Sequence, residues 1–346
     1  MYWLARPVSA KTRGLGPFEL EERVATWCHG NMSSVAVSPT VVFAERDRTI
    51  LGVKTVIASH NLVGDPLFSD ESIEAILDDY PPERLFALTM GTDPLKSSDN
   101  ERLDHSKVSG SELMEAVRMG RMWLNITGID SVDPRFRELT DELYGALVRE
   151  VPGSSQTHAT LLVSSPHAMV YYHVDGPPSC LWHIRGEKRL WVYPALDESL
   201  LARDLLEDVF AGVRQEYVPY QHEFDSRAEV FDLVPGDVAL WPQNSPHRVT
   251  NGNSLNVTLV TDHFTPDARR RARLYSANQF LRTRAHVPHR LLSVKETGMS
   301  ANGKVVLHKA ARKMGLGHPI TKAHRVPVHR VDPTAPNGMR PIDSQS

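Results

Sequence analysis

The sequence lacks the marks of a secreted or membrane-spanning protein. Two cysteines occur among 346 residues, which is too few for a disulfide framework and fits a reducing compartment. No run of about 18 apolar residues could span a bilayer. The first residues contain no apolar segment with a cleavage site behind it, so no secretory signal is predicted. We therefore expect a cytoplasmic protein that does not cross a membrane.

Long runs of lysine and arginine are also missing, although the basic residues are unevenly distributed. Residues 266–346 contain 16 Lys and Arg against 4 Asp and Glu, whereas the whole chain has a net charge of −3. A basic tail of this kind can bind nucleic acid, dock on the acidic body of its own chain or contact a second subunit. Because it has neither an unbroken basic run nor interleaved aromatic residues, we expect docking rather than nucleic-acid binding.

The first part of the chain, residues 1–155, is predicted to be an α/β region. β-Branched runs bounded by Ser, Pro and Gly predict strands, and apolar residues at helical spacing behind a capping residue predict helices. The strands are expected within 33–44 and 49–59, and the helices within 68–82, 109–120 and 133–151.

Residues 156–265 have the pattern of an antiparallel β domain. Short apolar runs separated by Gly, Pro, Asn or Asp predict a sandwich or barrel, interrupted by a helical insertion near 197–213. A helix over 266–284 opens the C-terminal region, 266–346. The last residues of that region are rich in Pro, Asn and Ser, so we expect its end to be partly disordered.

Polar residues stand among the predicted strands where a core would carry apolar ones. In the stretch HVD, His173 and Asp175 are two residues apart and would project from the same face of a strand. A third ligand could come from His247, which follows a Pro- and Asn-containing turn. Two histidines and one carboxylate form the facial triad of non-haem Fe(II) oxygenases, whereas HVD alone fits an ordinary strand with satisfied polar groups.

The stretch GDVALWPQNSPHRVTN favours the metal site over the ordinary strand. It resembles the cupin motif, in which Gly, Pro, Gly, His and Asn stand at fixed spacings. Gly236, Pro242, His247 and Asn251 fill four of these positions. Asn244 stands where the motif has its second Gly, and Asn tolerates left-handed backbone geometry better than most residues.

Lys188 lies fifteen residues after His173, beyond the turn around Arg185–Gly186, on the neighbouring strand. In a charged hairpin it fits a surface lysine. If it points into a barrel, the buried ammonium group is costly unless an anion meets it. An acidic co-substrate would supply that anion.

Together, HVDGPPSCLWHIRGEKRLWVYP and the later PGDVALWPQNSPHRVTN resemble the jumonji-C Fe(II)/2-oxoglutarate oxygenases, over about residues 158–264. The hairpin is most similar to the hydroxylase branch typified by the asparaginyl hydroxylase that inhibits hypoxia-inducible factor. The resemblance implies a mainly β fold, with a double-stranded β-helix (cupin or jelly-roll) core, an α/β N-terminal region and C-terminal helices. Such helices often dimerise, so a homodimer is expected.

The resemblance also implies the site. Fe(II) would be held by His173, Asp175 and His247, and 2-oxoglutarate by Lys188, with O2 as the second co-substrate. Ser179 stands where the asparaginyl hydroxylase has an Asn that helps to seat the co-substrate, and Val170 where it has a Thr. The second contact to 2-oxoglutarate is therefore open.

Three further residues are candidates for that contact by strand parity, and each also fits an ordinary polar residue of a barrel. They are Thr160, Asn256 and Thr258.

The resulting hypothesis is an oxygenase that hydroxylates a C–H bond of a protein or peptide side chain, or of an amino-acid-like substrate, and releases succinate and CO2. One alternative is demethylation of N-methyl-lysine or N-methyl-arginine by the same chemistry. Another is a metal-binding cupin that is not an oxygenase, either an isomerase or a ligand-binding module. This last alternative would not require Lys188.

Overall fold

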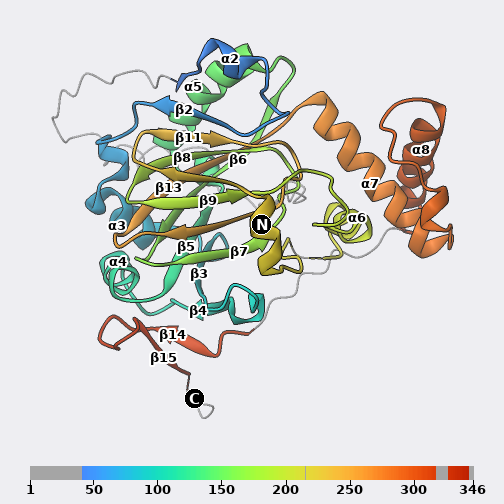
Figure 1. Ribbon diagram of the computed structural model, residues 1–346. Coiled ribbons are helices and arrows are strands. Elements are labelled where there is room, and N and C mark those ends of the chain that lie inside the picture. The colour runs from blue at the N-terminus through green and yellow to red at the C-terminus, as the bar shows by residue number, and fades with distance from the viewer. Residues whose placement is uncertain (1–40, 215, 317–325, 343–346) are drawn as a thin grey trace, which may run out of the picture. The chain divides into compact units, whose positions relative to one another are not determined.

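Two β-sheets form the framework of the protein (Figure 1). The computed structural model describes residues 41–214, 216–316 and 326–342. The larger sheet has eleven strands in the order β1-β2-β11-β8-β13-β6-β5-β3-β4-β14-β15, and the smaller has four in the order β10-β9-β12-β7. The strands before residue 155 are β1 (Val41–Val42), β2 (Val56–His60), β3 (Leu85–Thr89), β4 (Glu101–Asp104) and β5 (Met122–Thr127).

Eight consecutive strands, β6 to β13, pair in a nested order across the two sheets. Their pairs are β6 with β13, β7 with β12, β8 with β11 and β9 with β10. The chain therefore runs as one long antiparallel hairpin that is folded across both sheets. The strands are β6 (Ser155–Ser164), β7 (Met169–His173), β8 (Ser179–Arg185), β9 (Lys188–Val192), β10 (Glu229–Leu233), β11 (Asp237–Leu240), β12 (His247–Asn251) and β13 (Asn256–Phe264).

The strands of the N-terminal region extend the larger sheet at both sides of this hairpin. β2 pairs with β11, and β5 pairs with β6. The N-terminal region, which we expected to flank the barrel, therefore belongs to the same sheet as strands β6, β8, β11 and β13. Apolar residues of both parts form one buried cluster, which includes Val56 on β2 and Leu259 on β13.

Three helices cover the face of the larger sheet that points away from the smaller one. Helix α3 (Asp70–Asp79) begins at Ser69, whose side chain accepts a hydrogen bond from the N–H of Ser72. A capping box of Ser109 and Glu112 starts α4. The other two helices are α4 (Gly110–Met119) and α5 (Pro134–Glu150), and a short helix, α2 (Glu45–Arg48), precedes all three. The helices pack on the sheet through buried residues such as Ile73 and Leu113.

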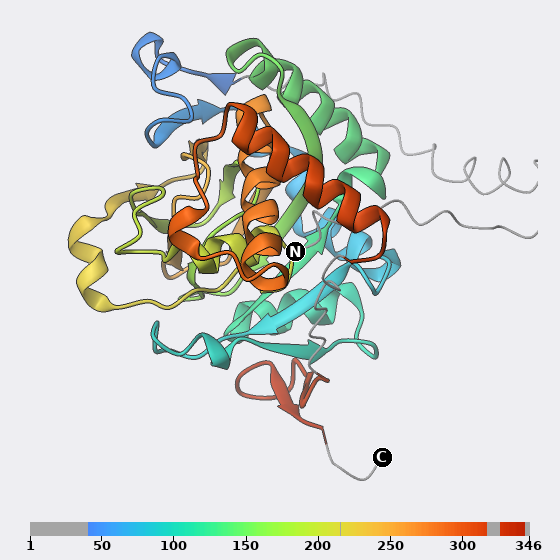
Figure 2. The ribbon, with the colours of Figure 1, turned by 90° about the vertical axis from the view of Figure 1, so that its right-hand side faces the viewer.

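The remaining helices lie beside the sheets. α6 (Arg203–Phe210) packs against α7 (Pro266–Arg284), and α8 (Met299–Lys313) packs against α7 (Figure 2). Exposed apolar residues such as Met299 and Val306 remain on α8. The homodimer expected through the C-terminal helices stays a prediction. No helix in the described part of the chain combines the length and apolar character needed to cross a bilayer.

Most elements that the sequence predicts are present, but the strands β3, β4 and β5 and the helix α8 were not predicted. Three of the predictions also differ from the structure. Residues 49–54, expected to belong to a strand, form turns before β2. The strand expected within 33–44 lies largely outside the described residues, and Val41–Val42 form β1.

The third difference concerns the end of the chain, which we expected to be partly disordered. In residues 326–342 the strands β14 (His329–Val331) and β15 (Met339–Pro341) form a hairpin. β14 pairs with β4, an edge that the local composition could not reveal. Residues 317–325 and 343–346 lie outside the described part.

The close approach of α3 and α4 gives a stability prediction. A Cβ atom at Gly110 would overlap the backbone carbonyl oxygen of Glu74, so we expect Gly110→Ala to lower the free energy of unfolding by about 1–3 kcal/mol. Gly145, exposed in α5, has no atom within 4 Å of such a Cβ. Gly145→Ala is the matched control and should raise that free energy by about 0.5–1 kcal/mol. Urea denaturation measures both, and equal effects would contradict the helix contact.

Candidate metal centre

Three potential metal ligands meet where β7 and β12 lie side by side. The ladder pairs His173 at the end of β7 with His247 at the start of β12, and Asp175 follows two residues after His173. One ligand atom from each of the three lies within 4.8 Å of the others. The Nε2 atoms of His173 and His247 lie 3.8 and 3.4 Å from the carboxylate oxygens of Asp175.

The tautomers of the two histidines fit a cation. Nδ1 of His173 lies 2.7 Å from the carbonyl oxygen of Tyr171, and Nδ1 of His247 lies 3.2 Å from that of Ser245. A carbonyl accepts, so each Nδ1 carries a hydrogen, and in the neutral form of each ring Nε2 turns a lone pair toward the carboxylate. Burial lowers the pKa of His247 to about 4, which keeps its imidazole neutral. Lone pairs that face a carboxylate without a proton between them favour a metal ion at this point.

A β-bulge lies beside the ligand pair. His247 pairs with His173, but Val249 pairs with Val170, so Tyr171 and Tyr172 both stand opposite Arg248. Such an insertion re-aims the side chains next to it and occurs often beside active sites. Val170 stands where the asparaginyl hydroxylase that the sequence resembles has a Thr. Its side chain packs in the apolar cluster between the sheets.

The turn before His247 holds the loop that carries Asp175. Asn244 adopts a left-handed conformation with φ 66°, as expected for an Asn that replaces a Gly. Its Nδ2 donates to the carbonyl oxygen of Asp175 at 3.1 Å, and Nε2 of Gln243 donates to that of Gly176 at 2.8 Å. The departure from the motif therefore adds a contact that a glycine could not make.

A second carboxylate, which the sequence analysis missed, lies behind Asp175. Ser179 Oγ donates to Asp262 Oδ1 at 2.7 Å and lies 3.5 Å from Asp175 Oδ2. Nε2 of His158 lies 3.2 Å from Asp262 Oδ2. Burial, followed by the charge of Asp175, holds the pKa of Asp262 well above its usual range. Its position four residues after Thr258 on the same strand was the available signal, because both then share a face.

The segment after α6 also contributes side chains near the centre. The N–H of Val174 donates to the carbonyl oxygen of Glu216, and the N–H of Val218 to that of Tyr172. This pairing covers the free edge of β7 and stacks the Tyr217 ring against His173, with ring centroids 6.0 Å apart. Burial raises the pKa of the nearby Glu216. Nothing in the local sequence indicated this pairing.

Lys188 is buried between the sheets and has no acidic partner among the described residues. It is 8% exposed, and its Nζ donates to Asn251 Oδ1 at 2.9 Å. Burial lowers its pKa to about 7. Asn251 in turn donates to Ser164 Oγ. The surface-lysine alternative is therefore wrong, because the side chain is buried and its Nζ pairs with a neutral amide.

The strand register relates Lys188 to the three potential ligands. Along β9, Val192 pairs with His247 and Lys188 with Asn251. The four-residue offset puts Lys188 on the same face as Val192 and about 13 Å along the strand. Lys188 therefore lies at the opposite end of β9 from the residue that pairs with His247.

The other predicted co-substrate residues fall into different places. Ser179 lies at the metal end, Thr160 is buried on the inner face of β6, and Thr258 Oγ1 lies 3.4 Å from His183 Nδ1. Asn256 is committed elsewhere. Its Nδ2 donates to the carbonyl oxygen of Ser254, and the side chain packs under the hairpin turn, where a Cβ at Gly186 would meet it at 2.5 Å.

Comparisons with known proteins do not assign a family. No family model matches the chain, and no curated protein matches it either. Similar solved structures include ycfD of E. coli, with a TM-score of 0.48 and 15% identity over 83% of this chain and 70% of that chain. Another is YcfD, a ribosomal oxygenase from Escherichia coli, in complex with cobalt and 2-oxoglutarate, with a TM-score of 0.42 and 13% identity over 85% and 75%. Similarity at this level assigns neither a fold family nor an activity.

The burial of Lys188 predicts a pH-dependent cost in stability. Its pKa is lower in the folded chain, at about 7, than in the unfolded chain, near 10.5. Between these values the unfolded state binds more protons, so this residue makes the protein more stable as pH rises. We expect Lys188→Met to be more stable than wild type near pH 7 and this advantage to shrink toward pH 10.

Urea denaturation of both proteins across this range measures the difference. Lys107→Met is the control, because Lys107 is exposed before α4, and its difference from wild type should stay flat. If the stability advantage of Lys188→Met instead grows with pH, burial does not lower the pKa of Lys188.

Proposed function

We propose that this protein is an Fe(II)- and 2-oxoglutarate-dependent oxygenase that hydroxylates a C–H bond of a peptide side chain or amino-acid-like substrate. The observation that carries the proposal is the pairing of two features on the inner faces of the sheets. One is the set of His173, Asp175 and His247 within 4.8 Å of one another. The other is the buried Lys188 without an acidic partner.

The topology supports the same proposal. The nested pairing of β6 to β13 across two four-strand groups is the connectivity that a double-stranded β-helix requires. Sequence motifs that resemble those of the jumonji-C oxygenases fall on its ligand strands, β7 and β12, and on the β8–β9 hairpin. The position of IRGEKR in this hairpin is our reason to favour the hydroxylase branch.

The metal ligands have the chemistry that Fe(II) prefers. Two neutral imidazoles and one carboxylate on one side of the ion leave positions open for co-substrates. When bound, Fe(II) would supply the redox chemistry that activates O2. Asn244 and Gln243 restrain the backbone at Asp175 and Gly176, which helps to position the ligand set before any ion enters.

Lys188 would pair with the distal carboxylate of 2-oxoglutarate. The buried ammonium gains a charge-assisted hydrogen bond in this way and offsets the cost of its burial. Asn251 holds its Nζ in place through the bond at 2.9 Å. The candidates for the second contact to 2-oxoglutarate remain Ser179, Thr160 and Thr258. They line the inner faces of the sheets between Lys188 and the three proposed metal ligands.

The overall reaction balances with these co-substrates. One oxygen atom of O2 enters the substrate C–H bond as a hydroxyl group. The other enters succinate as 2-oxoglutarate loses CO2. The isomerase and ligand-binding alternatives do not require a buried lysine at position 188, so they explain the site less well.

The decisive experiment follows succinate in the presence of Fe(II), ascorbate and 2-oxoglutarate without added substrate. We expect slow turnover by wild type and none by His173→Ala, because that variant loses a metal ligand. In Lys188→Met we expect 2-oxoglutarate to bind the Mn(II)-loaded protein at least about thirtyfold more weakly, as for loss of a buried charged partner. Lys107→Met, with its change at the surface, is the control and should match wild type.

Binding of 2-oxoglutarate is the readout that decides when turnover is absent. If the Mn(II)-loaded wild type does not bind 2-oxoglutarate, the oxygenase proposal fails. If it binds equally well to wild type and Lys188→Met, the assignment of Lys188 fails while the metal site stands.

A further inference from the structure

The hydrogen-bond partner of Lys188 is a neutral amide that lies directly across the strand ladder. Lys188 on β9 pairs with Asn251 on β12, and Lys188 Nζ donates to Asn251 Oδ1 at 2.9 Å. Residues paired in this way share a face of the sheet, so their side chains can interact. Lys188 and Asn251 are 8% and 9% exposed. The contact between them is therefore shielded from solvent.

Two acceptors determine which way the amide of Asn251 faces. Its Nδ2 donates to Ser164 Oγ and to the carbonyl oxygen of Ser165, each at 2.8 Å. A carbonyl oxygen can only accept, and an ammonium group can only donate. The reverse orientation would set Nδ2 against the ammonium group and Oδ1 against the carbonyl oxygen of Ser165. The amide oxygen must therefore face Lys188.

The segment that holds the Asn251 amide is itself fixed. Ser165 Oγ donates to the carbonyl oxygen of Val117 on α4 at 2.6 Å and accepts from the N–H of Met122 on β5 at 2.9 Å. The backbone N–H of Asn251 donates to the carbonyl oxygen of Ala168 at 2.8 Å. The amide oxygen is thus in place before a ligand binds, which reduces the entropy cost of ordering the lysine side chain.

An amide partner leaves the buried ammonium group of Lys188 without a counter-ion among the described residues. Burial alone lowers the pKa of Lys188 to about 7, as expected where no carboxylate offsets desolvation. The neighbouring His183 is no counter-ion either, because burial and the charge of Lys188 lower its pKa to about 3. The cost of burying this charge is therefore offset only when an anion binds.

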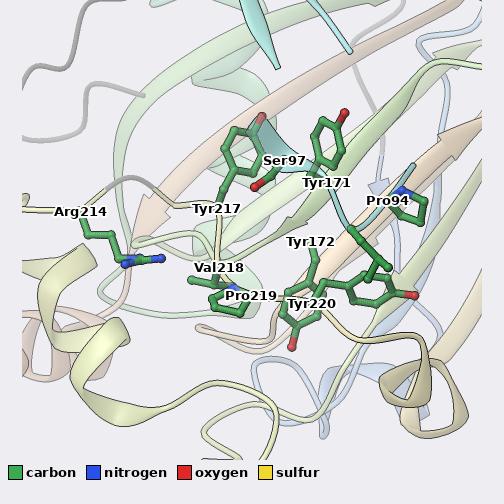
Figure 3. A pocket seen from close by; sticks show the side chains of 10 residues that line it. Pro94, Ser97, Tyr171, Tyr172, Arg214, Tyr217, Val218, Pro219 and Tyr220 are labelled. Carbon is green, nitrogen blue, oxygen red and sulfur yellow. The ribbon is translucent and has the colours of Figure 1, made fainter. Parts of the chain in front are cut away.

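Arg214 offers a second positive charge beside an open space. It is the one charged residue that lines the cavity of about 150 Å³ shown in Figure 3. Neither Lys188 nor any of the three proposed metal ligands lines this cavity. Arg214 is exposed, so water already solvates its guanidinium group and an anion gains little by pairing with it. Lys188 is therefore the better partner for an acidic ligand.

We propose that Asn251 determines which 2-oxo acids the protein binds. Its amide positions the Lys188 ammonium group without neutralising it, so the site selects a 2-oxo acid with a second carboxylate at its far end. Asn251 acts through Lys188 and is a positioning residue. The proposal rests on the proposed function, because it concerns the end of the co-substrate that points away from the metal ion.

The test replaces the amide by a carboxylate of nearly the same shape. In Asn251→Asp an internal ion pair occupies Lys188, and the distal carboxylate of 2-oxoglutarate then meets a like charge. We expect 2-oxoglutarate to bind the Mn(II)-loaded variant at least about thirtyfold more weakly than it binds wild type. Calorimetry measures both affinities. Equal binding to wild type and Asn251→Asp overturns the proposal.

A second ligand shows whether the loss concerns the distal carboxylate. 2-Oxopentanoate has the same 2-oxo acid group but carries a methyl group where 2-oxoglutarate has its second carboxylate. We expect Asn251→Asp to bind 2-oxopentanoate at least as well as wild type does, because this ligand brings no like charge to the ion pair. If both ligands weaken by the same factor, Asn251 does not determine specificity.

The affinity for Mn(II) alone separates specificity from damage to the fold. Asn251→Asp should bind Mn(II) as tightly as wild type, since the changed residue pairs with Lys188 at the other end of β9 from the residue that pairs with His247. If Mn(II) and 2-oxoglutarate are both lost, the role of Asn251 is structural and the proposal is overturned. Should this variant not fold, Asn251→Ser replaces it. We expect it to weaken 2-oxoglutarate about fivefold, as for one lost hydrogen bond, and to leave Mn(II) binding unchanged.

Two control variants complete the experiment. Asn278 is buried on α7 and accepts a hydrogen bond from Lys304 Nζ at 2.8 Å, so Asn278→Asp makes the same change at a second lysine. It should bind 2-oxoglutarate as wild type does. Arg214→Gln should also match wild type, and a loss of 2-oxoglutarate in this variant instead of Asn251→Asp overturns the proposal in favour of the cavity.

Binding of 2-oxoglutarate to wild type separates this proposal from the proposed function. If the Mn(II)-loaded wild type binds 2-oxoglutarate and Asn251→Asp binds it equally well, only the role of Asn251 is overturned. If the Mn(II)-loaded wild type does not bind 2-oxoglutarate, the proposed function is overturned, and the role of Asn251 with it.

Discussion

The register between β7 and β12 is the constraint on which the site depends. It sets His173 opposite His247, with a bulge beside the pair, and the Nε2 atoms of both rings lie within 4 Å of the Asp175 carboxylate. A shift by one residue would move a histidine to the other face of the sheet. The turn at 242–246 helps to prevent that shift, because Asn244 and Gln243 tie it to the loop after β7. Strand pairing therefore positions the two histidines, whereas Asp175 lies on a loop that hydrogen bonds hold to this turn.

The charges inside the barrel are separated along its length. Asp175 and Asp262 lie at one end, while Lys188 lies at the other among neutral partners such as Asn251 and His183. Burial and the nearby ammonium lower the pKa of His183 to about 3, so this imidazole adds no second cation. The co-substrate of the proposed function carries an acidic group at each end, and one of these groups would pair with Lys188.

Local sequence was sufficient for the parts of the site that lie on single strands or turns. His173 and Asp175 could be predicted from their spacing, and His247 from the turn before it. Asp262 and Tyr217 could not be predicted in this way. Their places depend on pairing between segments far apart in the sequence, for example Asp262 with His158 on β6. Lys188 is an intermediate case, because its spacing was informative but its burial depends on four other strands.

The shared sheet has a consequence for how the protein unfolds. The four barrel strands of the larger sheet have β2 at one edge and β5 at the other, and their outer face is covered by helices from before residue 155. Removal of the chain before β6 would expose two sheet edges and an apolar face at once, which invites association with other chains. We therefore expect residues 41–155 to unfold together with the strands that follow them.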